Sequence, residues 1–207
     1  MKHLRSLLVG VALLAAFPAV AQVNQVPQVG VTSSYVSRVT YSTAFFGLVP
    51  AASTTDLICI AGSATKTVKL QSLKLSGSGT AISVPVTLLR RASVDTGGTA
   101  ASTTANPANT IAKRDSNNPT ATAVPIAYTA NPTIVDTAPT YIDSAQLGVV
   151  ATTVGVVDAP LVFDYGMDPS QLRQAPTLRG VAEQICVNLN GTSATALLTG
   201  TMTWTEE

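Results

Sequence analysis

The clearest pattern in the chain is the stretch Ile82-Ser83-Val84-Pro85-Val86-Thr87-Leu88. Its apolar residues alternate with serine, proline and threonine, which is typical of a β-strand with one face in a core and the other toward solvent. Pro85 has no N–H to donate to a sheet, so this strand must lie at an edge or turn that position away from a neighbouring strand. A half-buried strand is therefore expected at 82–88.

The sequence on both sides repeats this alternation of strand and turn. Further strands are expected at 57–61, 67–75, 123–128, 140–151, 161–165, 183–189 and 199–204. Within 67–75 the apolar positions change parity, which predicts a bulge near Gln71-Ser72. Asn190-Gly191 is a strong signal for a tight hairpin. No stretch of the mature sequence has the period of an amphipathic helix.

These features predict an all-β fold, an antiparallel β-sandwich of jelly-roll type. One long loop is expected at 92–123, which is rich in threonine, alanine and serine and has scarcely any apolar bulk. Connections of this length in a compact domain are usually functional or mobile. The expected organisation is a signal peptide at 1–21, an N-terminal arm at 22–34 and a single β-sandwich domain at 35–207.

The N-terminus predicts export. Lys2 and Arg5 precede an apolar run at 6–17, and residues 18–21 (PAVA) supply the small-residue pattern of a cleavage site before Gln22. The run is shorter than the roughly 20 residues that span a bilayer, and no second run follows. The mature protein is thus expected to be periplasmic, secreted or on the cell surface, with no transmembrane segment.

Composition removes several classes of function. The single histidine, His3, lies in the expected signal peptide, so the mature chain lacks the imidazole on which Ser-His-Asp sites, Cys-His sites and the usual zinc sites depend. The expected mature chain has ten lysines and arginines and eleven acidic residues, and these charges are scattered singly along the sequence. Without a basic stripe, nucleic acid is not an expected partner. The chain is interpreted as a non-enzymatic protein with no cofactor and no metal.

Cys59 and Cys186 lie inside two of the most apolar segments, 57–60 and 185–187. In an oxidising compartment they are candidates for a disulfide, which would close a long loop and stabilise the fold by up to about 4 to 5 kcal/mol. The alternative is two buried, reduced thiols that never meet.

Three short motifs have a catalytic or ligand-binding interpretation and a simpler structural one. Ser63 and Lys66 have the S-x-x-K spacing of penicillin-recognising enzymes, but that chemistry needs a helix, and here a polar turn is favoured. Residues 77–80 (GSGT) are interpreted as a hairpin turn and not as a phosphate loop. Residues 190–192 (NGT) fit a glycosylation triplet and, preferably, a turn.

Two further groups of side chains remain open. Asp158, Asp164 and Asp168 are either a calcium cluster or solvated acids of a loop. Tyr41, Phe45 and Phe46 are either an exposed platform for stacking on sugars or part of the core.

Several segments together resemble a group of small β-rich proteins encoded among the structural genes of tailed phages and prophages. The segments are 62–67 (GSATKT), 115–119 (DSNNP), 127–132 (AYTANP), 161–166 (LVFDYG), 178–180 (LRG), 188–191 (NLNG) and 204–207 (WTEE). The resemblance covers the chain from about Tyr41 to its end. It implies a non-enzymatic role at a virion surface and supplies no catalytic residues.

The leading hypothesis is a structural or surface-display protein that is exported and either self-associates or decorates a particle or cell surface. A virion is the alternative location. The alternative function is an exported carbohydrate-binding or adhesive module, with Tyr41, Phe45, Phe46 and the loop 92–123 as its contact surface. The expected partners are other copies of the chain, a particle or cell surface, or a glycan.

Overall fold

The computed structural model describes residues 38–101, 110–151, 159–166, 174–193 and 195–207. All of them belong to one compact unit, Ser37–Glu207. They form strands and connections, and none of them lies in a helix long and apolar enough to cross a membrane. The expected signal peptide and N-terminal arm lie outside the described residues.

The described residues form twelve strands. They are β1 (Thr40–Leu48), β2 (Thr54–Ala61), β3 (Thr67–Gly79), β4 (Ile82–Arg91), β5 (Thr99–Ala100), β6 (Ile111–Lys113), β7 (Val124–Ala130), β8 (Thr140–Ala151), β9 (Leu161–Asp164), β10 (Thr177–Arg179), β11 (Gln184–Thr192) and β12 (Ala196–Glu206). The predicted all-β class is confirmed.

The strands form one continuous sheet in the order β5-β7-β2-β11-β4-β8-β3-β12-β1-β6, with β9 and β10 also paired to β3. Among the described strands only β3 and β8 run parallel, through Gly77–Gly79 and Val149–Ala151. The sheet is therefore of mixed type. This differs from the expected purely antiparallel arrangement, because β8 pairs with β4 along most of its length and then joins the edge of β3.

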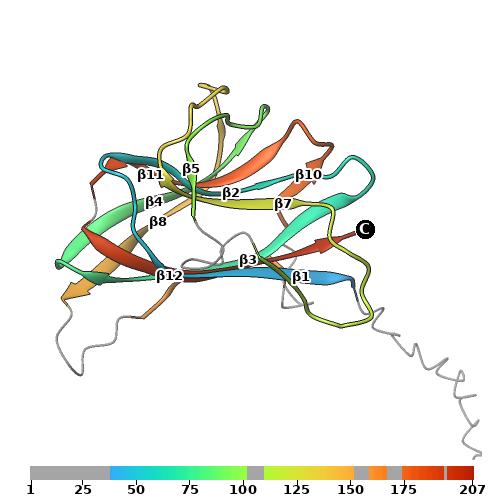
Figure 1. Cartoon of the computed structure of the whole chain (residues 1–207), viewed down its shortest axis with the longest axis horizontal. Helices are drawn as coiled ribbons and strands as arrows, with labels where there is room; N and C mark the ends of the chain where they lie inside the picture. The colour runs from blue at the N-terminus through green and yellow to red at the C-terminus, as the bar shows by residue number, and fades with distance from the viewer. Residues whose placement is uncertain (1–37, 102–109, 152–158, 167–173, 194) are drawn as a thin grey trace, which may run out of the picture. The chain divides into compact units, whose positions relative to one another are not determined.

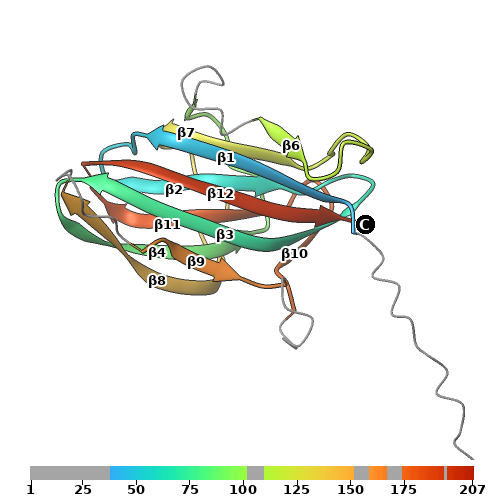
Figure 2. The same ribbon diagram turned by 90° about the horizontal axis from the view of Figure 1, so that it is seen from below.

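The sheet curls so that its two halves face each other. In Figure 1, β2, β4, β7 and β11 lie in one layer, and β1, β3 and β12 in the other. Figure 2 shows the second layer from below, with β9 and β8 beyond β3. Apolar side chains from both layers form one core, in which the rings of Tyr41 and Trp204 stack with centroids 5.9 Å apart.

β2 and β11 are buried on both faces, which explains their unbroken apolar runs. Ile58 and Ile185 belong to the main core. Cys59 and Cys186 belong to a second, smaller cluster, which is completed by Leu89, Tyr128 and Ile126. Strands with a core on each side have no solvent face, so their sequence cannot alternate.

Two local predictions have different outcomes. Gln71 has no partner on β12, where Thr203 pairs with Ser72 and Trp204 with Leu70, so the predicted bulge is confirmed. The hairpin predicted at Asn190-Gly191 is wrong. Both residues have positive φ, but they interrupt the pairing of β11 with β2, and the chain then crosses to β12 in the other layer.

The expected long loop at 92–123 contains two short strands, β5 and β6, which pair with β7 and β1.

Pro85 is accommodated because β4 pairs with β11 only from Thr87 onward, so β4 has no hydrogen-bonded partner in β11 at the proline.

Gly200 has a packing role that gives a test of the core. It lies opposite Phe45, and a Cβ at this position would come within 2.2 Å of the Lys74 carbonyl oxygen and 2.7 Å of the Phe45 ring. Gly200→Ala should therefore destabilise the fold by about 1 to 3 kcal/mol, measured as a lower urea midpoint. Thr199→Ala, at an exposed position of the same strand, is the control. An unchanged midpoint for Gly200→Ala would contradict this packing.

Candidate functional site

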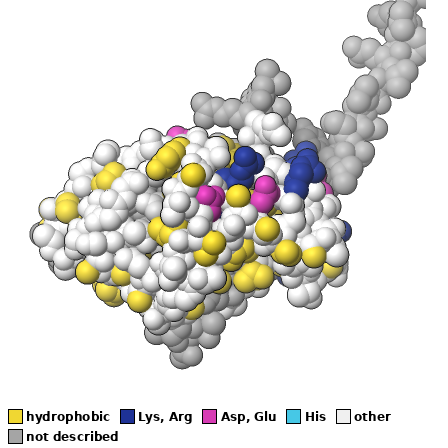
Figure 3. Space-filling view, turned by 90° about the horizontal axis from the view of Figure 1, so that it is seen from above, with side chains coloured by type: hydrophobic (Ala, Val, Ile, Leu, Met, Phe, Trp, Pro, Cys, Tyr) yellow, Lys and Arg dark blue, Asp and Glu magenta, His cyan; other side chains and the backbone are white. Residues whose placement is uncertain are grey.

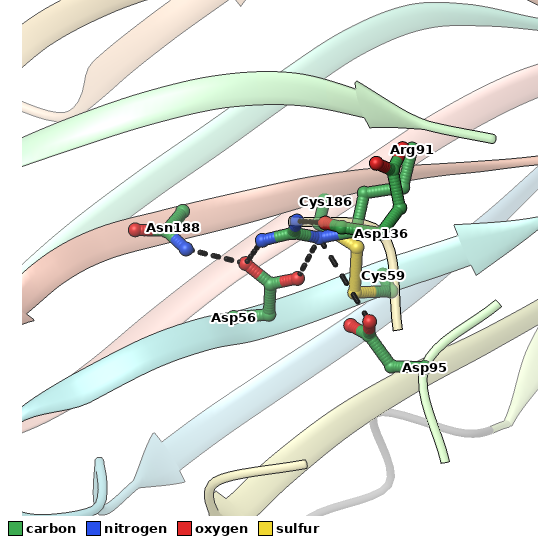
Figure 4. Close-up of a disulfide and its surroundings, with 7 residues drawn as sticks. All are labelled: Asp56, Cys59, Arg91, Asp95, Asp136, Cys186 and Asn188. Atoms are coloured by element: carbon green, nitrogen blue, oxygen red, sulfur yellow. Dashed lines mark hydrogen bonds and ion pairs between the residues drawn. A yellow bond between two sulfur atoms is a disulfide. The ribbon is translucent and has the colours of Figure 1, made fainter. Parts of the chain in front are cut away.

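The densest group of charged side chains is buried beside the two cysteines (Figure 4). Arg91 at the end of β4 donates from Nε to Asp56 Oδ2 at 2.6 Å and from Nη2 to Asp56 Oδ1 at 3.0 Å. Asn188 Nδ2 donates to the same Asp56 oxygen at 2.5 Å. A further Arg91 nitrogen donates to the Asp136 carbonyl oxygen. The guanidinium thus ties β2, β4 and the segment before β8 together.

A bulge places Asp56 in this group. β11 pairs Val187 with Ile58 and Asn188 with Asp56, so Leu57 is an extra residue on β2. Without it, Asp56 would share the parity of Ile58 and point into the apolar core. The bulge turns the carboxylate to the opposite face, beside the disulfide.

Asp95 is the member of the group without a hydrogen bond. Its side chain is fully buried, and neither of its oxygens has a hydrogen-bond partner among the described residues, although Oδ1 lies 3.9 Å from Arg91 Nε. Burial, together with the nearby negative charge of Asp56, raises the pKa of Asp95 to about 6. Gln184 and Arg91 oppose this rise.

The disulfide joins Cys59 and Cys186, which are directly paired residues of β2 and β11. Both cysteines are buried, and Figure 4 shows them within the same group of side chains as Asp56, Arg91 and Asp95. The bond closes a loop with a sequence separation of 127 residues.

The donor atoms of Asp56, Cys59, Asp95 and Cys186 lie within 4.8 Å of one another, as in a metal site. However, the two sulfurs are bonded to each other, and both Asp56 oxygens accept hydrogen bonds from Arg91. Only Asp95 retains free oxygens. With the disulfide formed, these side chains therefore serve to hold the strands together and are not arranged to bind a metal ion.

Ser63 and Lys66 do not form a nucleophile and base on one helix face. Ser63 is buried, and its hydroxyl oxygen accepts hydrogen bonds from the backbone N–H groups of Thr65 and Lys66, each at 3.1 Å. This is the polar turn favoured by the sequence interpretation. The Thr122 hydroxyl lies 2.7 Å from both Ser63 Oγ and Glu206 Oε2.

Glu206 anchors the connection before β7. Its carboxylate accepts hydrogen bonds from the backbone N–H groups of Thr122 and Ala123 and from the Trp204 indole. These bonds outweigh the effect of burial and lower the pKa of Glu206. Its acceptor capacity is used inside the fold.

Of the two alternatives for Tyr41, Phe45 and Phe46, the exposed aromatic platform does not form. Tyr41 and Phe45 are each 1% exposed and belong to the main core, because alternate residues of β1 point inward opposite Trp204 and Gly200. Only Phe46, at 55% exposure, lies at the surface. A sugar-stacking site on these three residues is therefore excluded by their burial.

Of the three acids considered for calcium, only Asp164 is described. It lies in β9 opposite Ser72, whereas Asp158 and Asp168 fall outside the described residues. Residues 77–79 (GSG) end β3 and pair with β8 and β12, and Thr80 lies in the connection to β4, so the hairpin turn expected at 77–80 is not formed. Residues 190–192 (NGT) lie in the irregular end of β11.

β8 has a long edge without a strand partner among the described residues. Residues 140–149 pair with β4 on one side, while pairing with β3 on the other side begins only at Val149. Tyr141 at one end of this edge is 67% exposed. Ser144 and Gln146 are also exposed, and Asp143 is the one charged side chain in the strand.

The sequence interpretation missed Asp56, Arg91 and Asp95. The available signals were a lone aspartate inside the run 54–61 (TTDLICIA) and an arginine followed four residues later by an aspartate.

No protein-family model, curated protein or solved structure matches this chain.

The raised pKa of Asp95 predicts a pH-dependent stability with a definite sign. Between about pH 4 and pH 6 the folded state keeps a proton that the unfolded chain has released, so this stabilising contribution is lost as pH rises. Asp95→Asn cannot ionise and should gain about 2 to 3 kcal/mol relative to the wild type between pH 4 and pH 7.5. Urea unfolding of both proteins across this range measures the difference.

Asp136→Asn is the matched control. Backbone N–H groups of Ala92 and Ala138 lower the pKa of Asp136, so its contribution is present at neutral pH and is lost on acidification, the opposite sign. A pH-independent difference between the Asp95→Asn variant and the wild type would contradict the arrangement described for Asp95.

Removing the disulfide should destabilise the fold by about 2 to 5 kcal/mol, because the loop that it closes is long. The test is urea unfolding of the Cys59→Ala/Cys186→Ala variant, with reduced wild-type protein as the control that should unfold at the same midpoint. Equal midpoints for the variant and the oxidised wild type would show that the bond is not a stabilising tie.

Proposed function

We propose that the chain is an exported, non-enzymatic structural protein that self-assembles and displays itself on a particle or cell surface, in the manner of the phage virion proteins that it resembles. The observation that carries the proposal is the long edge of β8. Its backbone N–H and C=O groups at 140–148 have no strand partner among the described residues on the side away from β4. A second copy of β8 can satisfy them by antiparallel pairing.

The composition of this edge favours such pairing. Natural sheet edges are usually protected by charged residues, proline or a bulge, all of which discourage a second strand. β8 has no proline and only one charged residue, Asp143. A bulge in its pairing with β4 falls near Tyr141 and leaves the segment from Asp143 to Val149 regular. Two antiparallel copies would bury the flat stretch around Ser144 and Gln146.

The use of the polar side chains supports a structural role. Ser63, Glu206 and the Asp56–Arg91 pair, which are the side chains with the best catalytic chemistry, are engaged in internal hydrogen bonds. On the face drawn in Figure 3, charged side chains are few and stand among uncharged polar and apolar groups. Such a surface offers little electrostatic repulsion to a neighbouring copy.

The proposal includes a jelly-roll type of sandwich for the curled sheet. Support comes from the path of the chain, because β1, β3 and β12 lie in one half and β2, β4 and β11 in the other. Each of the steps β1 to β2, β2 to β3, β3 to β4 and β11 to β12 thus crosses between halves. Repeated crossing of this kind is how jelly rolls assemble their two layers.

Self-assembly is tested by analytical ultracentrifugation of the mature protein from Gln22 over a range of concentrations. The wild type should form dimers or larger species. The Ser144→Lys/Gln146→Lys variant should remain a monomer, since two antiparallel copies of β8 would bring like charges together.

Thr199→Lys is the control, because Thr199 is exposed on β12, which has a strand on both sides. It should assemble as the wild type does. A wild type that stays monomeric at every concentration, or a double variant that assembles normally, would refute the proposed edge. Circular dichroism of all three proteins establishes that they are folded.

A further inference from the structure

A groove of about 600 Å³, lined mainly by residues that carry polar groups, crosses the outer face of the second layer. This volume is within the usual range for small-molecule sites. The strands that form it, β9, β3, β12 and β1, lie side by side in Figure 2. Its lining consists of Thr40, Ser72, Lys74, Arg114, Val162, Asp164, Thr201 and Thr203.

The strand register arranges these side chains in two parallel rows. Thr203, Ser72 and Asp164 are directly opposite one another across β12, β3 and β9. One step along the same face, Thr201, Lys74 and Val162 form the second row. Neighbouring strands are about 4.8 Å apart, so each row presents side chains at regular intervals over roughly 10 Å.

Most of this hydrogen-bonding capacity is not used within the protein. Ser72, Thr201 and Thr203 are described residues whose hydroxyl groups have no hydrogen bond to other described residues. Lys74 and Arg114 form no ion pair with any described carboxylate. Thr40 donates its hydroxyl proton to the Arg38 carbonyl oxygen and can still accept.

We propose that this groove binds an acidic oligosaccharide, one whose sugar units carry both hydroxyl groups and carboxylates. The three hydroxyls of the floor can each donate and accept, which suits a polyhydroxylated ligand. Lys74 in the second row and Arg114 at the opposite side supply two cations for ligand carboxylates. The exposed side chain of Val162 provides an apolar contact for the carbon face of a sugar ring.

Asp164 favours an acidic oligosaccharide over a nucleic acid as the ligand. It places a carboxylate in the same groove as the two cations, opposite Ser72. A carboxylate accepts hydrogen bonds from sugar hydroxyls but repels a continuous phosphate backbone, whose binding depends on dense positive charge. The groove therefore suits a chain with spaced negative charges. This site differs from the aromatic one considered as an alternative in the sequence, and it does not depend on the assembly edge of β8.

The test is isothermal titration calorimetry of the mature protein with tetragalacturonate as the probe. Its fully methyl-esterified form, which keeps the hydroxyls and loses the charges, is the first comparison, and a single-stranded oligonucleotide is the second. Tetragalacturonate should bind, and salt should weaken it. Each comparison ligand should bind at least about tenfold more weakly. The methyl ester lacks the carboxylate charges, and the oligonucleotide has a continuous phosphate backbone in place of spaced carboxylates.

Two variants locate the site. Lys74→Gln and Arg114→Gln should each lower the affinity for tetragalacturonate by about tenfold or more. Lys113→Gln removes the neighbouring exposed cation of β6, which does not line the groove, and should change the affinity less than about twofold. Lys74→Arg should retain binding.

Absence of tetragalacturonate binding would overturn the proposal, as would equal binding of the methyl ester or tighter binding of the oligonucleotide. Equal losses of affinity for tetragalacturonate in Lys113→Gln and Arg114→Gln would also overturn the proposal, since they would indicate attraction by net charge alone. Unchanged urea midpoints of the variants exclude unfolding as the cause of a loss. Sedimentation of the Ser144→Lys/Gln146→Lys variant with and without tetragalacturonate distinguishes ligand binding by the groove from self-assembly through β8.

Discussion

The pairing of β2 with β11 is the constraint on which the rest of the structure depends. These two strands have a core on each face: one side supports the main apolar core between the layers, and the other holds the disulfide and the buried charges. A chain in which only 5% of residues are aromatic has few large side chains to bury. Using both faces of the same two strands increases the apolar area removed from water.

The charges on the second face follow from this arrangement. A buried ion pair adds little net stability compared with apolar packing, but loss of one partner leaves an uncompensated charge. Arg91 therefore fixes the relative positions of β4, β2 and the segment before β8, because Asp56 and the Asp136 carbonyl must both lie within its reach. The bulge at Leu57 is what makes this register compatible with the apolar core.

The fold class and several local features could be predicted from sequence because they depend on near neighbours. The alternation at 82–88 and the change of parity at Gln71 are properties of single strands. The partners of each strand depend on contacts between distant residues, which explains why Asn190-Gly191 suggested a hairpin that is not formed. The burial of Tyr41 and Phe45 was left open for the same reason, and the groove appears only when four strands are aligned.

The two proposed surfaces lie on different parts of the sheet, the edge of β8 and the outer face of β3 and β12, so one molecule can use both. The proposed function places the protein outside the cytoplasm as an assembled component. The most direct measurement is mass spectrometry of the native culture, separated into density-purified particles and cell-surface material, soluble exported protein, and cytoplasm. A peptide that begins at Gln22 is expected in stoichiometric amounts in the particle or surface fraction. A protein that retains residues 1–21 and occurs only as a soluble cytoplasmic species would contradict the proposed function.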